Sequence, residues 1–199
     1  MISCRRPSSP VLLSLLLVSL LGLSTPTSPA CAGSIFVPRM ALHLLPVTGK
    51  NACERSAAAP ACNAIVTRGD LYPASYFGYL LVTSADPTAG LAGLELGLEY
   101  NGAPHQGVDI LTWVNCASLN FPQLGWPAAG TGNVITWDSH VRCQRNEPAG
   151  PGTGVVAAAG YFYLAAYSAD VLRIVPRQLN NLAAIANCSN VEVHMEGDG

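Results

Sequence analysis

Two glutamates stand four residues apart in the most regular stretch of the chain, GLELGLEYNG (93–102). Paired carboxylates serve glycosidases as acid and base, about 5–5.5 Å apart for retention or about 6.5–9.5 Å apart for inversion. In a strand, Glu95 and Glu99 project to the same face and lie roughly 13 Å apart at about 3.3 Å per residue. This spacing is too wide for either mechanism, so the stretch predicts the solvated face of a strand.

Other patterns for catalysis and metal binding are absent from the sequence. The histidines share no H-x-H or H-E-x-x-H spacing, and the acids form no D-x-[DN]-x-[DN]-G loop. No serine lies in a G-x-S-x-G elbow. We therefore predict no catalytic residue, no metal and no cofactor. Two alternatives stay open: a calcium ion held jointly by several loops, and an acid from another strand that joins Glu95 or Glu99.

Aromatic residues offer a different chemistry, the stacking of sugar rings. The flat face of a Trp or Tyr ring binds the apolar face of a pyranose, while nearby polar groups bond its hydroxyls. Trp126 lies in the loop-like segment LGWPAAG, and the segment ITWD places Trp137 beside Asp138. Together with Tyr163, these three residues are our candidate ligand-binding set. The alternative is that the rings fill the core.

The first 32 residues have the pattern of a signal peptide. Arg5 and Arg6 form a basic region, residues 11–23 are apolar, and residues 30–32 (ACA) fit a cleavage site. The apolar run is shorter than the ~20 residues that a membrane-spanning helix needs, and no later run is longer. We expect residues 1–32 to be removed and residues 33–199 to form one secreted, periplasmic or cell-surface domain. The alternative is a lipoprotein anchored at Cys31.

Removal of this leader sets the charge of the mature chain. Without Arg5 and Arg6, eight of the ten basic residues remain against twelve acidic ones, a formal charge of −4. Nucleic-acid binding needs clustered lysines and arginines, yet lysine occurs once, at Lys50. The composition therefore argues against a nucleic-acid partner and leaves an extracellular carbohydrate or protein as the partner.

Five cysteines remain after the leader, and in an exported chain they are typically disulfides. Cys53 and Cys62 bracket a short loop, and Cys116 and Cys143 flank a Pro/Gly-rich excursion. We predict these two bridges. Cys188 is then unpaired or links two chains, although spacing alone does not determine the connectivity.

Period-two alternation and turn residues dominate the mature chain and predict an all-β domain. We expect strands at residues 40–45, 63–67, 76–83, 92–100, 108–116, 133–138, 155–159, 161–167 and 171–175, and weaker ones at 182–187 and 191–195. Residues 182–188 (LAAIANC) suit a strand or a helix, and residues 117–132 and 144–154 form long connections. About 8–10 short strands are typical of an antiparallel β-sandwich, either jelly-roll or cohesin-like.

Several of these stretches also resemble known proteins. AGLELGLEYNG (92–102), leading into GVDILTW (107–113), resembles the early strands of cohesin-like and carbohydrate-binding-like sandwiches. VVAAAGYFYLAAYS (155–168) resembles a sheet strand with a glycine kink. With GWPAAGTGNVITWD (125–138) and the cysteines, it is similar to a group of uncharacterised exported bacterial β-sandwich proteins over most of residues 34–190. The resemblance implies the fold, and fold analogy does not establish function.

These patterns together predict an exported, noncatalytic binding or assembly module for a carbohydrate or a protein. The alternatives are a carbohydrate-active hydrolase or lyase on a jelly-roll scaffold, and a structural component of the cell envelope. A sugar binder requires exposed aromatic rings, and an enzyme requires two acids within about 10 Å in a cleft. A structural subunit requires an exposed apolar patch or an unpaired edge strand.

Overall fold

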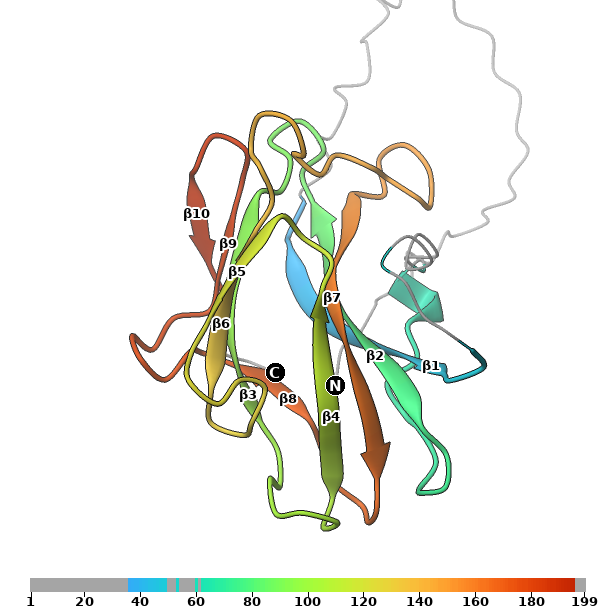
Figure 1. Ribbon diagram of the computed structural model, residues 1–199. Helices are drawn as coiled ribbons and strands as arrows, with labels where there is room; N and C mark the ends of the chain where they lie inside the picture. The colour runs from blue at the N-terminus through green and yellow to red at the C-terminus, as the bar shows by residue number, and fades with distance from the viewer. Residues whose placement is uncertain (1–35, 50–52, 54–59, 61, 196–199) are drawn as a thin grey trace, which may run out of the picture. The chain divides into compact units, whose positions relative to one another are not determined.

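The computed structural model describes residues 36–49, 53, 60 and 62–195, so the predicted signal peptide lies outside the described residues. In residues 36–195, ten strands form two antiparallel sheets (Figure 1). One sheet has the order β1-β2-β7-β4, and the other has the order β10-β9-β3-β6-β5, with β8 also pairing with β3. Buried residues from both sheets share one core. The predicted antiparallel β-sandwich is therefore confirmed.

The four-stranded sheet contains the longest strands. They are β1 (Arg39–Pro46), β2 (Tyr76–Ala85), β4 (Val108–Asn115) and β7 (Val155–Ala166). The strands that we predicted at residues 155–159 and 161–167 are one continuous strand. Opposite Leu80 and Leu81 of β2, β7 contains one extra residue next to Gly160, which shifts the register of the pairing. The strand bends at this bulge but continues beyond it.

The second sheet is built mainly from short strands. They are β3 (Gly93–Glu99), β5 (Leu119–Pro122), β6 (Gly132–Thr136), β8 (Arg173–Val175), β9 (Ala184–Ala186) and β10 (Glu192–His194). The prediction missed β5, whose proline is tolerated because β5 is an edge strand. It was wrong at residues 63–67, where the chain forms a short 3-10 helix, η2 (Cys62–Ala64), and then irregular backbone.

The alternation of β3 divides its side chains between the core and the outer face. Leu94, Leu96 and Leu98 are at most 3% exposed and pack in the core with Ile135 of β6 and Phe162 of β7. Full burial of one such leucine contributes roughly 1.5–3 kcal/mol. The residues between them project outward, as the period of a strand requires.

The four-stranded sheet is also buried over part of its outer face, on β1, β2 and β7. Tyr79 and Tyr161 are at most 8% exposed and form a second cluster with Cys53, from the connection between β1 and β2. His43 is buried too, and its Nδ1 accepts a hydrogen bond from the backbone N–H of Val66 at 3.0 Å. Burial lowers the pKa of His43, so its imidazole is neutral near pH 7.

Two disulfides link distant parts of the chain, Cys53 with Cys116 and Cys143 with Cys188. Both predicted pairings are therefore wrong, and Cys188 is neither unpaired nor an interchain link. The side chain of Cys62 lies outside the described residues. Disulfides are typical of oxidising compartments, which agrees with the predicted export.

The geometry of the sheets explains this connectivity. Cys53 lies against the outer face of the four-stranded sheet, where it meets Cys116 at the end of β4 with a Cα–Cα distance of 5.2 Å. Cys143 and Cys188 follow β6 and β9, which flank β3 in the other sheet. A Cβ atom on Gly90 would clash with both of their sulfurs, so the glycine makes room for the bridge.

Disulfide mapping tests this arrangement. Proteolysis of the unreduced protein followed by mass spectrometry should recover one linked peptide pair containing Cys53 and Cys116, and another containing Cys143 and Cys188. Replacing Cys143 and Cys188 together with serine should lower the free energy of unfolding by about 2–5 kcal/mol. Recovery of a Cys116–Cys143 link would contradict the structure.

A second prediction concerns Gly160, at the bend of β7. A Cβ atom there would clash with the indole of Trp113 and with the carbonyl oxygen of Val114. Gly160→Ala should therefore lower the free energy of unfolding by about 1–3 kcal/mol in urea denaturation followed by tryptophan fluorescence. Gly49→Ala is the control, because nothing lies within 4 Å of its added Cβ atom. Equal stability of the two variants would refute the argument.

Candidate functional site

The four residues that we predicted to bind a ligand do not come together. Trp137 is 6% exposed and belongs to the core, so its selection as a stacking residue is corrected. It follows the inward-facing Ile135 by two residues and therefore shares its face. Tyr163 lies in the other sheet, where its ring packs beside Phe77 with centroids 5.8 Å apart.

Trp126 is half-buried and closes one end of the core. Its ring packs edge-on against Trp113 at 5.6 Å and beside Phe162 at 5.8 Å between centroids. The Nε1 atoms of Trp113 and Trp126 are buried and have no hydrogen-bond partner within the described residues. This packing explains the position of Trp126 without a ligand, and carbohydrate stacking on Trp126 stays a prediction.

Asp138 is exposed but already engaged. Its carboxylate accepts hydrogen bonds from the backbone N–H groups of His140 at 2.8 Å and Val141 at 3.0 Å. These hydrogen bonds lower the pKa of the Asp138 carboxyl, and the bond from Val141 has the larger effect. The side chain therefore closes the turn after β6, which is a common structural role of aspartate.

The structure instead assembles a surface on the outer face of the six-stranded sheet. The strand registers align two rows of outward side chains, in the order β10-β9-β3-β6-β5. One row is Glu192, Ala186, Gly93, Thr136 and Leu119; the other is His194, Ala184, Glu95, Val134 and Phe121. We call these ten residues the sheet face. The sequence shows single strands of this surface, and only the pairing brings the strands together.

A hollow of about 250 Å³ lies on the sheet face. Its floor is formed by Gly93, Ala184 and Ala186, whose side chains are too small to fill the surface. Glu95 and Glu192 line it as well. The hollow is therefore lined by four adjacent strands, β10, β9, β3 and β6, and holds two carboxylates.

Glu95 is held in place by the connection between β8 and β9. Its Oε1 forms an ion pair with Arg177 Nη1 at 2.9 Å and accepts a hydrogen bond from Asn180 Nδ2 at 2.7 Å. This connection crosses the sheet over Gly97, where a Cβ atom would lie 2.8 Å from the carbonyl oxygen of Pro176. The predicted solvated face holds for the exposed Glu99, whereas Glu95 is largely covered and paired.

The β5 side of the sheet face is apolar and exposed. Leu119 and Phe121 are 59% and 55% exposed, and the loop after β5 exposes Leu124 completely. Val134 of β6 lies beside Phe121 in the register. Contiguous exposed apolar residues at a sheet edge are unfavourable in water unless something covers them. The sequence signal for this strip was the alternation of Leu119 and Phe121, which we had assigned to a loop.

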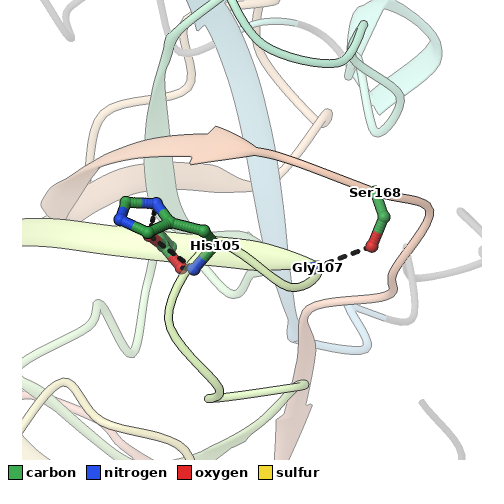
Figure 2. A network of polar contacts seen from close by, with 4 residues as sticks. His105, Gly107 and Ser168 are labelled. Atoms are coloured by element: carbon green, nitrogen blue, oxygen red, sulfur yellow. Dashed lines mark hydrogen bonds and ion pairs between the residues drawn. The ribbon is translucent and has the colours of Figure 1, made fainter.

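A second polar cluster lies where β4 begins and β7 ends (Figure 1). His105 Nδ1 is 3.3 Å from Asp109 Oδ2, and Ser168 lies on the facing loop. These are the residue types of a catalytic triad. However, Ser168 Oγ accepts a hydrogen bond from the Gly107 N–H at 2.9 Å, and Figure 2 shows it directed at Gly107 and not bonded to the imidazole. The geometry is therefore not that of a nucleophile and its base.

Asp170 ties the same loops together. Its Oδ2 accepts hydrogen bonds from the backbone N–H groups of Asn101 at 3.1 Å and Val108 at 3.0 Å, and its Oδ1 accepts one from Val171 at 2.8 Å. Burial alone would raise the pKa of Asp170, but these three hydrogen bonds outweigh it and lower the pKa. Asp170 is thus a structural carboxylate.

Clusters of metal-binding side chains and long apolar helices are both absent from the described part of the chain. In those residues, no group of three or more His, Cys, Asp or Glu side chains could hold a metal ion. The same residues contain no helix that is long and apolar enough to cross a membrane.

The fold is that of a disulfide-linked antiparallel β-sandwich. The chain is similar to a cohesin module from a family 33 glycoside hydrolase of Clostridium perfringens, with a TM-score of 0.47 and 8% identity. The match covers 81% of this chain and 92% of that module. The predicted cohesin-like resemblance is thus confirmed as a weak one, of fold alone. No family model and no curated protein matches the chain.

The role of Asp170 leads to a prediction about pH. Folding lowers the pKa of Asp170. The ionised carboxylate therefore stabilises the folded protein at pH values above about 3.9, the ordinary pKa of an aspartate. This stabilisation is lost as the pH falls through the lower pKa of Asp170 in the folded protein. Asp170→Asn should reduce the melting temperature at pH 7 by about 2–4 °C, for a loss on the order of 1 kcal/mol.

The pH series provides the control for this prediction. The difference in melting temperature between the wild type and Asp170→Asn should shrink between pH 5 and pH 2. Glu99 is exposed and has no side-chain hydrogen bond or ion pair within the described residues, so Glu99→Gln should melt like the wild type throughout. A deficit of Asp170→Asn that did not change with pH would contradict the assigned role.

Proposed function

We propose that the chain is a noncatalytic binding module that docks a protein partner on the sheet face. The observation that carries the proposal is the register that places Leu119, Phe121 and Val134 side by side, next to the hollow. Protein interfaces combine an apolar centre with a polar rim, and this surface has both.

The chemistry of the partner follows from the charges on the sheet face. The carboxylate of Glu95 is already matched by Arg177 at 2.9 Å. Glu192 is exposed, and its nearest ion-pair partner is the exposed His194 at 3.8 Å. We infer a partner that places apolar side chains against Leu119 and Phe121, and a lysine or arginine over Glu192.

A protein fits this surface better than a sugar does. The hollow is floored by glycine and alanine, and the aromatic residue that lines it, Trp137, is only 6% exposed, so little of its ring is available for stacking with a pyranose. The hydrolase alternative requires two acids in a cleft, and Glu95 and Glu192 do line the hollow. Glu95, however, is fixed against the sheet by Arg177 and Asn180, which gives it a structural role.

Binding variants test the proposal. The immobilised protein is incubated with the extracellular fraction of its own source, and each captured protein is purified and titrated against the wild type and Phe121→Asp. The proposal expects Phe121→Asp to weaken binding by at least about tenfold, because a charge replaces an apolar contact at the centre of the surface. Glu192→Lys should also weaken it, through repulsion of the cationic residue.

The controls separate this surface from the rest of the molecule. Leu111→Asp changes an exposed leucine of β4, in the other sheet, and should bind like the wild type. Light scattering of the protein alone shows whether a second copy covers the surface. A dimer that Phe121→Asp dissociates would replace the proposed partner, and a captured protein that binds both sheet-face variants normally would refute the proposal.

A further inference from the structure

Three aromatic rings form an exposed stack at one end of the sandwich, where β2 and β4 begin and β7 ends (Figure 1). The rings of Tyr72 and Tyr167 are nearly parallel, 5.0 Å apart and inclined by 15°. His105 meets Tyr167 edge-on at 4.6 Å. We call these three residues the aromatic platform. None of them belongs to either core cluster, so the packing of the core does not explain them.

The outer ring of the aromatic platform is open to a ligand. Tyr72 is 61% exposed although Tyr167 covers one of its faces. Its other face is therefore directed to solvent. A stacked aromatic ring with one free face is the geometry that binds the apolar side of a flat molecule.

The backbone holds the aromatic platform in place before any ligand arrives. The N–H of Tyr72 donates to the carbonyl of Ala166 at 2.6 Å, and the N–H of Tyr167 donates to the carbonyl of Gly107 at 2.7 Å. The N–H of His105 donates to both oxygens of Asp109, at 3.1 and 3.2 Å. Because three loops are tied to one another, binding requires little ordering of the protein.

The edges of the rings carry polar groups that are available for hydrogen bonds. Asp109 engages Nδ1 of His105, which leaves Nε2 directed elsewhere. Within the described residues, neither this Nε2 nor the hydroxyls of Tyr72 and Tyr167 have a hydrogen-bond partner. The aromatic platform thus combines an apolar face with neutral donors and acceptors around it.

We propose that the aromatic platform binds a carbohydrate, with a pyranose ring stacked on the free face of Tyr72. Its hydroxyls would bond the phenol groups and His105 Nε2. A pyranose fits because it has an apolar face and a rim of neutral hydroxyls. This site is separate from the sheet face and does not rest on the proposed protein partner.

Polysaccharide binding by the whole protein tests the proposal. The wild type is mixed with insoluble cellulose, chitin and peptidoglycan, and the protein left in solution is measured. The matching soluble oligosaccharide is then titrated by calorimetry. We expect one polysaccharide to retain the wild type, Tyr72→Ala to weaken binding about tenfold, and Tyr72→Trp to retain it because stacking is preserved.

Matched variants make the result specific. Phe121→Ala removes an aromatic ring of similar exposure, 55%, from the sheet face and should bind the sugar like the wild type. Near-ultraviolet circular dichroism verifies that Tyr72→Ala is folded. The proposal is overturned if none of the three polysaccharides retains the wild type, or if Tyr72→Ala binds normally. It is also overturned if Phe121→Ala, and not Tyr72→Ala, loses the sugar, since that result places the sugar on the sheet face.

Discussion

The alternation of leucine with glycine and glutamate along β3 is the constraint on which the second sheet depends. This strand pairs with β6 on one side and with β8 and β9 on the other. Its leucines anchor the core, and a shift of one residue would exchange them with the outward residues. The outward positions are equally restricted, because Gly97 admits the crossing connection and Glu95 binds Arg177 of that connection. One strand therefore organises both the interior and the outer surface.

The two sheets differ in how their outer faces are used, and this difference locates the candidate sites. On the four-stranded sheet, Tyr79 and the neutral His43 are buried, and the Cys53–Cys116 disulfide fastens the covering connection. This part of the four-stranded sheet is therefore covered, although β4 at its edge exposes Leu111. The six-stranded sheet keeps an outer face with a hollow and an apolar edge. The fold thus leaves that face, and the loops at the ends, for recognition.

The sequence predicted the half-buried strands well because their side chains alternate, as in β3 and β7. It missed β5, whose four residues include a proline and are too few to show a period. The disulfides were mispaired because we assumed local loops, whereas the bonded cysteines are 63 and 45 residues apart and meet only after the sheets pair. Trp137 was chosen for its exposed neighbour Asp138, but adjacent strand residues face opposite ways.

The candidate sites were harder to predict because each is assembled from segments that share no local signal. Tyr72, Tyr167 and His105 come from three loops, and hydrogen bonds between those loops align the rings. Leu119 and Phe121 become a surface only when β5 pairs with β6. Since the two sites share no residue and are built on different elements, a substitution in one should leave the other intact. The proposed protein partner and the proposed carbohydrate would therefore contact the sandwich independently of each other.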